Sequence, residues 1–329
     1  MARRIIPIAS RLAQVIGLVL AVAIVSFTLL QLAPGDAAVV IAGDSGAGDP
    51  EVLAEIRETY GLDEPYVTQL GIYLGNVAQG DFGDSFRFNQ SVTSLISSRI
   101  WPTILLVSTA LFFAIIVGVA VGVYTARRPE SWSSHLATVL ALVGFSIPVF
   151  FLGLELVILF SSVLGWLPVG RMSDLQFEGN FIQRWVDIAE HLVLPAFTLG
   201  VLYLAQYSRL TRASMLETLQ SDFVRTARSK GLSERVVVYK HALRNAVIPI
   251  VTVAGLQFGS LLSGALVVET VFDWPGLGRL AFDSVLARDA PVLLGLLMLS
   301  SVLVIAANLL TDVVYRFIDP RIRVGANAS

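Results

Sequence analysis

Cysteine is absent from this chain of 329 residues, and charged residues are scarce. Without cysteine the chain forms no disulfide, holds no thiolate-bound metal and has no cysteine nucleophile. Charged residues make up 15% of the sequence, whereas soluble domains carry about a quarter. Hydrophobic residues make up 55%, and the mean hydropathy is +0.74. This composition indicates an integral membrane protein.

Lysine is also scarce: the chain has only two, Lys230 and Lys240. A P-loop needs Gly-x-x-x-x-Gly-Lys-Ser/Thr, in which the lysine reaches the terminal phosphates of a nucleotide. Gly231 follows the first lysine and His241 the second, so neither fits the motif. The three histidines are scattered and form no metal or triad constellation. We therefore predict no catalytic residue, no metal site and no cofactor in this chain, and no nucleic-acid partner.

Six runs with almost no charge are long enough, or nearly long enough, to cross a bilayer. They are Leu12–Ala33, Ile100–Ala126, Leu136–Val169, Leu192–Ser208, Asn245–Val268 and Ala290–Thr311. The first run follows three arginines, as the core of a signal peptide does. Its apolar core of about 22 residues exceeds the roughly 7–15 of a signal peptide. We interpret it as a retained transmembrane helix.

Basic residues are sorted to one side of these spans. Arg127 and Arg128 lie in the second loop, the fourth loop (209–244) is far more basic than acidic, and further arginines follow the last span. The alternate loops carry more acid than base. Because cytoplasmic loops hold the excess of lysine and arginine, both termini are expected in the cytoplasm. The prediction is an all-α polytopic protein with six transmembrane helices, in the bacterial cytoplasmic (inner) membrane.

The segment 34–98 between the first two spans is acidic and polar. Asp49-Pro50 is a typical helix start and Gly61 a typical stop, which predicts a helix over Pro50–Tyr60. A second helix is predicted to start at Pro65. The acidity is that of a cation site or of a solvated extracytoplasmic cap, and the sequence favours the cap. The expected domains are therefore 1–33 (first helix), 34–98 (cap), 99–316 (transmembrane core with the loop 209–244) and 317–329 (cytoplasmic tail).

Only one ionisable residue, Glu155, lies inside a long apolar run. Such residues usually face a pathway or a ligand, so Glu155 is a candidate contact for a substrate amine. Its span is unusually long, and a position near the outer headgroups explains it equally well. Gly118 and Gly122 form a small-xxx-small pair, which is typical of closely packed membrane helices.

The loop from Ser221 to Pro249 is a short basic island between apolar segments. Ser221 or Asp222 is a suitable N-cap for a helix beginning at Phe223, and Gly231 is a suitable left-handed stop. A short helix held between two spans has the right shape to enter a groove on another protein. The alternative is a basic cytoplasmic loop that binds anionic lipid, and composition alone favours that alternative.

The order of residues in this island resembles the cytoplasmic loop of ABC-transporter inner-membrane permeases of the dipeptide/oligopeptide/nickel type. This family commonly has RTARxKGL followed by HALRNAxxP, and the chain has RTARSKGL at Arg225–Leu232 and HALRNAVIP at His241–Pro249. The general Glu-Ala-Ala pattern is matched at Ala227 and Gly231, but its glutamate is replaced. Further matching motifs run nearly end to end: APGD (33–36), YGLDEP (60–65), GDFGDS (80–85), HLVLPAFTLG (191–200), ETVFDWPGLGR (269–279) and DPRIR (319–323).

The resemblance implies the fold of a type I ABC importer and a division of labour between subunits. Two similar permease subunits form the pathway, two ATPase subunits bind ATP and Mg²⁺ below them, and an extracytoplasmic solute-binding protein delivers the ligand. The helix 221–231 is then the coupling helix that sits in an ATPase subunit. The residues that the resemblance places at this contact are Asp222, Arg225, Thr226, Ala227, Gly231, Leu232, His241 and Arg244.

The resemblance also points to an outer gate or pathway lining at the Pro-Gly pair within ETVFDWPGLGR (269–279). Its candidate residues, beside Glu155, are Asp273, Trp274, Pro275, Gly276 and Arg279. A tight turn that joins two helices is an equally good reading of this motif. For the whole chain, the leading hypothesis is the permease subunit of an ATP-driven importer of peptides or related solutes. The alternatives are a carrier or channel that needs no partner, and a structural membrane scaffold.

Overall fold

A computed structural model describes residues 16–17, 19–28, 38–39, 41–42, 49–60, 62–85, 87–174, 179–262 and 265–318. Most of this part of the chain is helical. One two-stranded antiparallel ladder pairs Asp84 with Ser91 and Ser85 with Gln90, so the prediction of an all-helical chain missed a short β element. Strands of two residues are too short to show the alternation by which strands are recognised in a sequence.

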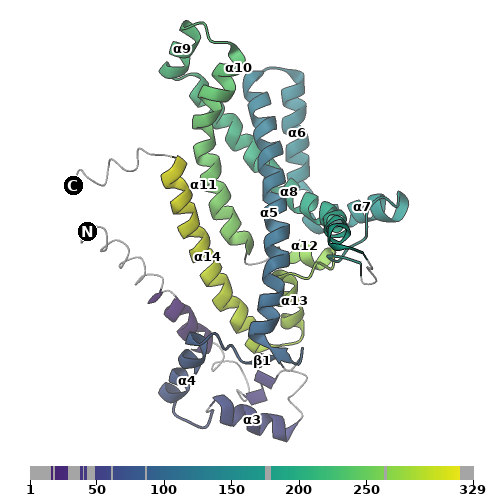
Figure 1. Cartoon of the computed structure of the whole chain (residues 1–329), viewed down its shortest axis with the longest axis vertical. Helices are drawn as coiled ribbons and strands as arrows, with labels where there is room; N and C mark the ends of the chain where they lie inside the picture. Colours follow the sequence, from purple (N-terminus) through teal and green to yellow (C-terminus); the bar gives the residue numbers. More distant parts are fainter. Residues whose placement is uncertain are drawn as a thin grey trace, which may run out of the picture. The chain divides into compact units, whose positions relative to one another are not determined.

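The elements carry the labels of Figure 1. In chain order they are α3 (Pro50–Tyr60), α4 (Tyr66–Ala78), β1 (Asp84–Ser85), β2 (Gln90–Ser91), α5 (Val92–Arg127), α6 (Trp132–Ser146), α7 (Val149–Leu156), the π-helix η1 (Val157–Val163), α8 (Phe181–Leu219), α9 (Asp222–Ser229), α10 (Glu234–Val236), the π-helix η2 (Val237–Ala242), α11 (Leu243–Leu262), α12 (Leu266–Val271), α13 (Leu277–Leu286) and α14 (Ala290–Ile318). The chain forms two compact units. Unit 1 consists of Met1–Thr103, Leu262–Leu266 and Pro275–Ile305, and unit 2 of Ile104–Leu261, Val267–Trp274 and Ala306–Ser329.

Within the described residues, four helices are long and apolar enough to cross a membrane. They are Val92–Arg127, Phe181–Leu219, Glu234–Gly259 and Ala290–Ala307, and a bent pair of helices makes a fifth if it is counted as one span. The predicted first span, Leu12–Ala33, falls partly outside the described residues; the part that is described includes an apolar helix at Val19–Thr28. The tail motif at 319–323 and the motif at 33–36 also lie outside them.

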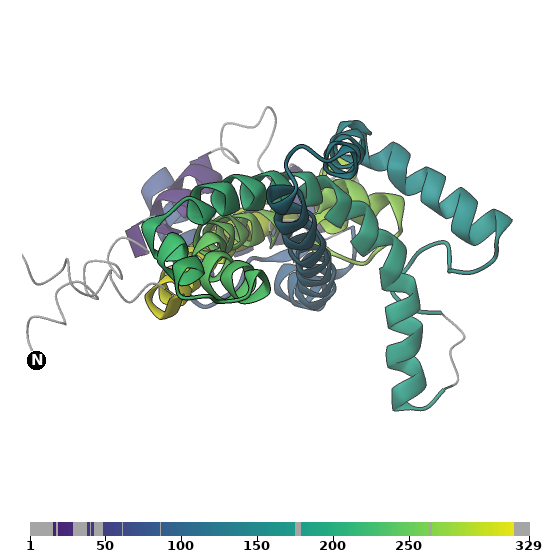
Figure 2. The same ribbon diagram turned by 90° about the horizontal axis from the view of Figure 1, so that it is seen from above.

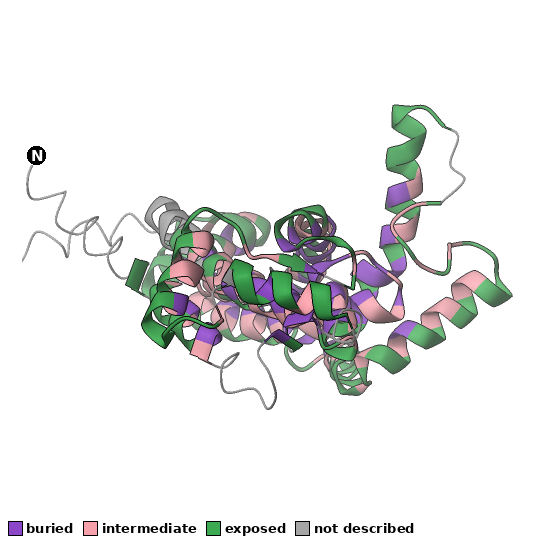
Figure 3. Ribbon diagram, turned by 90° about the horizontal axis from the view of Figure 1, so that it is seen from below, coloured by how far each residue is buried: buried purple, intermediate pink, exposed green. Residues whose placement is uncertain are grey.

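The predicted span Leu136–Val169 does not form one straight helix. It is divided into α6 and the α7–η1 arm, which are bent by 100° relative to each other. The break lies at Pro148, and Ile147 before it has an extended backbone with ψ of 129°. Proline disfavours the helical conformation of the residue that precedes it, so the helix ends there. Figure 2 shows the arm running away from α6, and Figure 3 shows that most of its surface is exposed or partly exposed.

Unit 1 contains the two helices predicted for the cap. α3 covers Pro50–Tyr60 as predicted, and the Asp49 carboxylate accepts a hydrogen bond from the backbone N–H of Glu51 at 2.9 Å. α4 begins at Tyr66, directly after Pro65. The start of α5 packs against α13 and α14 through one apolar cluster: Val92, Leu95, Ile96, Leu277, Leu280, Val292 and Leu296.

A buried carboxylate joins the β ladder of unit 1 to α14. Asp289 precedes this helix, and its carboxylate accepts hydrogen bonds from the Ser85 hydroxyl and from the backbone N–H of Val292, the latter at 3.3 Å. Burial raises the pKa of Asp289, and the two hydrogen bonds offset this only in part. Asp289 therefore acts as a buried cap of α14 whose ionisation is disfavoured.

Unit 2 depends on a close crossing of α5 and α8. A Cβ added at Gly118 would lie 2.8 Å from the Cβ of Tyr207, and one at Gly122 would lie 2.5 Å from the Cβ of Thr211. Real Cβ atoms do not approach so closely, so only glycine fits at these two positions. The predicted small-xxx-small contact is confirmed. It brings α5 and α8 together beside α9, which lies at one end of the unit-2 helices in Figure 1.

Candidate functional site

The short helix α9 is joined to the end of α8 through Ser221. The Ser221 hydroxyl donates a hydrogen bond to the Thr218 carbonyl of α8 at 2.6 Å, while its own carbonyl accepts from the backbone N–H groups of Val224 and Arg225 at 3.1 Å each. The side-chain cap that the sequence predicts for α9 therefore does not form with this serine. Ser221 therefore connects the end of α8 to the start of α9 through these hydrogen bonds.

The other end of α9 is closed by a left-handed turn at Gly231. Its φ is +76°, its backbone N–H donates to the Arg228 carbonyl at 2.9 Å, and that of Leu232 donates to the Ala227 carbonyl at 3.4 Å. This confirms the predicted stop. A Cβ added at Gly231 would meet no atom within 4 Å, so conformation and not space requires glycine here.

The inner face of α9 is anchored in the apolar core of unit 2. Val224 and Ala227 are 0% and 5% exposed and lie one turn apart on this face. They belong to a cluster that joins the ends of α5 and α8 to η2 and α11: Val123, Ala126, Met215, Val224, Ala227, Val237, Val238, Ala242 and Ala246. Ala227 thus packs inward and holds α9 against this cluster.

The outer face of α9 consists of exposed polar residues around one aromatic ring. Asp222, Arg225 and Thr226 are exposed; Arg225 forms an ion pair with Asp222, and the Thr226 hydroxyl donates to the Asp222 carbonyl at 2.9 Å. Phe223 is 46% exposed among them, and Leu232 beyond the turn is 40% exposed. An exposed aromatic ring with a polar rim is a typical anchor for a partner protein.

An ion pair links α9 to the following helix across the glycine turn. The Arg228 guanidinium donates to both carboxylate oxygens of Glu234 on α10, at 2.8 and 3.2 Å. This hydrogen bonding raises the pKa of Arg228 above its ordinary value. The exposed Arg228–Glu234 pair thus stabilises the turn on its solvent side, while the apolar cluster stabilises it on its buried side.

His241 and Arg244 lie further along, where η2 meets α11. Ala242 between them is buried in the cluster, whereas His241 is partly exposed and Arg244 is exposed. The His241 carbonyl accepts a hydrogen bond from the Asn245 side chain at 2.9 Å. The sequence-predicted contact residues thus divide into two kinds: Ala227 packs inward, and the others are at least partly accessible.

The candidate gate residues do not form one exposed surface. Trp274 is fully buried, Gly276 is buried before α13, and Arg279 forms an ion pair with Asp283 at 3.7 Å. Pro275 is partly buried beside them. These four positions have the burial expected of a packed turn between helices.

Asp273 is different, because it faces a cavity. The loop before α8 runs along the Phe272–Trp274 turn, with the backbone N–H of Arg171 donating to the Phe272 carbonyl at 2.7 Å and Arg171 Nε lying 3.2 Å from Asp273 Oδ2. Both residues have left-handed backbones, with φ of 69° and 53°. The cavity, of about 500 Å³, is lined by Pro168, Val169, Gly170, Arg171, Ser173, Asp174, His191 and Asp273.

Comparison with known proteins identifies the family. The model of the family described as "Binding-protein-dependent transport system inner membrane component" matches residues 118–324, and the model for the N-terminal part of such components matches residues 3–108. The chain belongs to this family. It is therefore an inner-membrane permease of the ABC-transporter class, and a multi-pass protein of the bacterial inner membrane.

Curated relatives cover the permease almost completely. The dipeptide transport system permease protein DppB of Alkalihalophilus pseudofirmus is 41% identical over an alignment of 332 positions that covers 95% of this chain and 98% of the relative. The glutathione transport system permease protein GsiC of Salmonella typhimurium is 44% identical over 314 residues, which are 95% and 97% of the two chains. The resemblance that the motifs indicate is thus confirmed at the level of the family.

A solved structure supports the fold of the permease. An inward-facing structure of the MetNI methionine ABC transporter superposes with a TM-score of 0.53 at 18% identity, and the match covers 68% of this chain and 96% of the other. At this identity the likeness is one of fold alone. It agrees with the expected permease fold, whereas the described residues account for four or five of the six predicted spans.

The remaining candidate of the permease, Glu155, lies on the exposed side of α7. Gly153, two residues earlier, packs on Phe272, where an added Cβ would lie 3.1 Å from the ring. Two residues correspond to about 200° of helix rotation, so Glu155 points away from this contact and is exposed. Among the described residues, no group of three or more His, Cys, Asp or Glu is arranged to hold a metal ion.

Sequence reasoning missed two features of the site. The Arg228–Glu234 pair was detectable as opposite charges on either side of the Gly231 turn. The exposure of Phe223 was not detectable, because Phe223 and Val224 are adjacent and only the packing of α9 decides which of them turns inward.

Proposed function

We propose that this permease forms half of the translocation pathway of an ATP-driven importer of peptides, and that α9 is the helix through which an ATPase subunit moves it. The observation that carries the proposal is the two-sided construction of α9. Its inner face is fixed in a cluster that includes the ends of α5, α8 and α11, and its outer face is accessible. A force on the outer face therefore acts on several helices at once.

The proposed contact with the ATPase consists of accessible residues around the Gly231 turn. Asp222, Arg225, Thr226, Gly231, Leu232, His241 and Arg244 form it, with Phe223 as a further anchor. Ala227 contributes by holding α9 in the cluster. ATP and Mg²⁺ belong to the ATPase subunits, because both lysines of this chain lie outside a P-loop motif.

The orientation belongs to the same proposal. With six transmembrane helices and both termini in the cytoplasm, the basic loop 209–244 and α9 lie on the cytoplasmic side, as the positive-inside rule requires. The other partners are a second, similar permease subunit and an extracytoplasmic solute-binding protein. The acidic cap 34–98 is then placed to meet the binding protein, 99–316 forms the core, and 317–329 a cytoplasmic tail.

The substrate class rests on the relatives. The two relatives described above belong to a dipeptide and a glutathione transport system, and glutathione is itself a peptide. A peptide carries an ammonium and a carboxylate group. The cavity at Arg171 and Asp273 offers a cation and an anion 3.2 Å apart, so this pair is the part of the gate segment that we place on the pathway. Glu155 is a second candidate for contact with a substrate amine, from the exposed side of α7.

The test is uptake of a labelled dipeptide into vesicles that contain this chain together with its ATPase, second permease and binding protein. We expect uptake only with ATP, and neither ATP hydrolysis nor uptake by the purified chain alone. ATP hydrolysis by this chain in isolation would contradict the proposal. Omitting one subunit at a time identifies which partners are required.

The second candidate function is a carrier or channel that needs no partner. The same vesicles separate it from the first, because a secondary carrier takes up substrate under an ion gradient without nucleotide. Glu155 is the feature that favours this candidate, since proton-coupled carriers use carboxylates within their spans. A scaffold, in contrast, gives no uptake under either condition.

A further inference from the structure

Two arginines on α8 have no acidic partner among the described residues. Arg209 and Arg212 lie one turn apart on the part of α8 that leads to α9. Arg212 Nη1 donates one long hydrogen bond, 3.4 Å, to the Thr138 hydroxyl, and the guanidinium carbon of Arg209 lies 5.8 Å from the centre of the Phe145 ring. A cation beside apolar helices is costly unless an anion compensates its charge.

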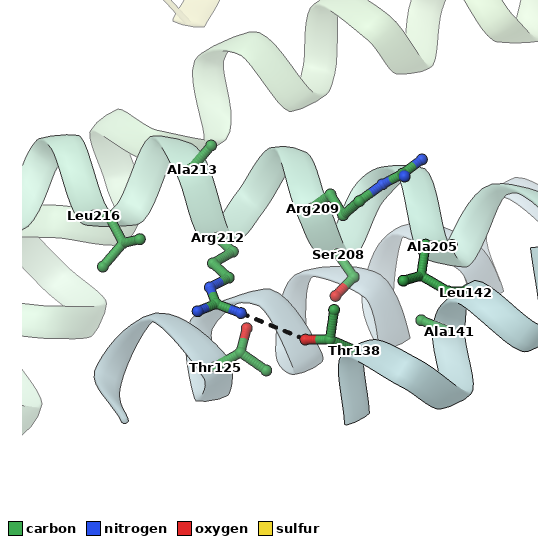
Figure 4. A pocket seen from close by; sticks show the side chains of 10 residues that line it. All are labelled: Thr125, Thr138, Ala141, Leu142, Ala205, Ser208, Arg209, Arg212, Ala213 and Leu216. Atoms are coloured by element: carbon green, nitrogen blue, oxygen red, sulfur yellow. Dashed lines mark hydrogen bonds between the residues drawn. The ribbon is translucent and has the colours of Figure 1, made fainter. Parts of the chain in front are cut away.

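Arg212 projects into a pocket between α5, α6 and α8, which Figure 4 shows from close by. The pocket has a volume of about 230 Å³. Three hydroxyl groups line it with Arg212, from Thr125, Thr138 and Ser208. The Ser208 hydroxyl has no hydrogen-bond partner in the described part of the chain. Arg209 points away from these groups and forms the rim (Figure 4).

Arg212 and the Ser208 hydroxyl are the donors that this pocket offers to a phosphate oxygen, because the Thr125 and Thr138 hydroxyls already donate to the Gly122 and Ser134 carbonyls. A guanidinium has five N–H donors in a planar fork, and Arg212 uses one of them within the described residues. Pairing of such a fork with phosphate is charge-assisted and about twice as strong as a neutral hydrogen bond. A cavity of this size is below the roughly 300–1,000 Å³ of sites for drug-sized molecules, but suits one small anionic group.

The wall of the pocket distinguishes a lipid from a soluble anion. Apart from the arginines and hydroxyls it is apolar, and the α6 surface next to it exposes Val139, Leu142, Val143 and Phe145. A free phosphate gains nothing from these side chains. In the bilayer this surface lies against acyl chains, so a lipid can lay a chain along α6 while its phosphate occupies the pocket, and no apolar group is exposed to water.

We propose that the Arg212 pocket is an anion site that holds the phosphate of an anionic phospholipid, with an acyl chain along α6. With the orientation proposed above, the lipid belongs to the cytoplasmic leaflet. The site lies directly beside the glycine crossing of α5 and α8, since Thr125 follows Gly122 by one turn and its hydroxyl donates to the Gly122 carbonyl at 3.1 Å. A bound lipid therefore stabilises the helices that carry α9.

The test measures phosphatidylglycerol bound to the full-length permease, purified with the subunits that accompany it in a neutral detergent. Native mass spectrometry gives the affinity for phosphatidylglycerol, which is anionic, and for phosphatidylcholine, which is zwitterionic and has no net charge. We expect preference for phosphatidylglycerol, and a loss of about tenfold or more in its affinity in Arg212→Gln, because a charge-assisted contact is removed. Arg184→Gln is the matched control, because Arg184 is exposed and lies near the start of the same helix. This variant should change the affinity for phosphatidylglycerol less than about twofold.

Two further variants keep the test decisive if Arg212→Gln does not fold. Arg212→Lys retains the charge and should retain most of the binding, whereas Thr138→Val removes the hydroxyl that orients Arg212 and should weaken binding. Equal loss in Arg184→Gln, or no loss in Arg212→Gln and Thr138→Val, overturns the proposal, because the attraction is then a general effect of surface charge.

A competition arm separates the two sources of phosphate. Inorganic phosphate that displaces phosphatidylglycerol, and stabilises the lipid-free protein in an Arg212-dependent manner, assigns the site to a soluble anion and overturns the lipid part of the proposal. If phosphatidylglycerol binds the chain alone but not the complete complex, a partner subunit covers the pocket and the proposal fails. Retention of the lipid in the complex, insensitive to inorganic phosphate, supports it.

Discussion

At the scale of single residues, two glycines are required for opposite reasons. Gly231 needs a left-handed backbone but has free space around it, whereas Gly122 has an ordinary helical backbone but no space. The first is a requirement of conformation and the second of packing. Substitutions therefore affect different properties of the permease.

Replacing Gly231 with valine should uncouple ATP hydrolysis from transport. A β-branched residue is strained at φ of +76°, so the end of α9 shifts while the anchored face stays in place. We expect uptake per ATP hydrolysed to fall several-fold, with little change in membrane insertion. Gly165→Val is the matched control, because Gly165 also has a positive φ (64°) and free space but lies in the loop after η1. Equal uncoupling by both variants contradicts a specific role for Gly231.

Replacing Gly122 with alanine should destabilise the fold. The new methyl group would lie 2.5 Å from Thr211 Cβ and 2.7 Å from the Ser208 carbonyl oxygen, and overpacking of this kind costs about 1–3 kcal/mol. Gly71→Ala on α4 has no atom within 4 Å and should instead stabilise, by about 0.5–1 kcal/mol. Thermal unfolding in detergent compares the two. A Gly122→Ala protein as stable as the wild type contradicts the close crossing of α5 and α8.

Asp289 makes the stability of unit 1 depend on pH. Because its folded pKa is raised, the folded state binds more protons than the unfolded state between the ordinary aspartate value of 3.8 and the raised value. The free energy of unfolding should therefore fall as the pH rises through that window. Asp289→Asn cannot ionise; its single amide oxygen can still accept from the Val292 N–H, while its NH₂ group can donate to the Ser85 hydroxyl oxygen. The difference in unfolding temperature between wild type and variant should change across the window; parallel curves contradict this account.

At the scale of elements, α9 and α10 behave as one unit because two contacts close the turn between them. The apolar cluster holds them from within, and Arg228–Glu234 holds them from outside. Short helices of this length are not stable by themselves. Their geometry, and with it the position of the outer face of α9, depends on both contacts.

Breaking the outer contact should affect coupling more than stability. An exposed ion pair contributes only about 0–1 kcal/mol, so Glu234→Gln should leave the unfolding temperature almost unchanged. Uptake per ATP should nevertheless decrease, since α10 no longer moves with α9. The charge swap Arg228→Glu with Glu234→Arg should restore part of it. A swap that is worse than either single variant shows that these residues act separately on the ATPase.

Much of the element-level description follows from local sequence signals. The Asp49-Pro50 start, the Pro65 start and the Gly231 stop each reflect a backbone requirement of one or two residues, and the structure has all three. A proline inside an apolar run indicates a kink or a helix boundary, so Pro148 was a candidate for the bend. The angle of 100° was not predictable, because hydrophobicity continues through the bend and periodicity carries no information on helix direction. The ladder at Ser85 was missed because its strands have only two residues each, and the contact of Ser85 with Asp289 was missed because Asp289 lies far away in the sequence.

At the scale of the whole molecule, family and membrane location were predictable, whereas the division of the site was not. Motifs such as RTARSKGL identify the family because several of them occur in a fixed order along the chain. These motifs do not reveal which of their residues are buried in the protein and which are accessible. Ala227 and Trp274 are buried, while Phe223 and Asp273 are accessible, and these differences arise from packing of segments distant in sequence.

The central claim is that the outer face of α9 is the seat of an ATPase subunit, and site-specific cross-linking tests it most directly. The chain has no cysteine, so Phe223→Cys introduces a single reactive thiol on that face, and Glu51→Cys on α3 provides an exposed control on the cap. In membranes with the complete transporter, we predict that the thiol at position 223 cross-links to the ATPase subunit and that the control thiol does not. The yield at position 223 should decrease when ATP binding or hydrolysis changes the contact. If the thiol at 223 reacts freely with a soluble maleimide but never cross-links to the ATPase, the account is contradicted.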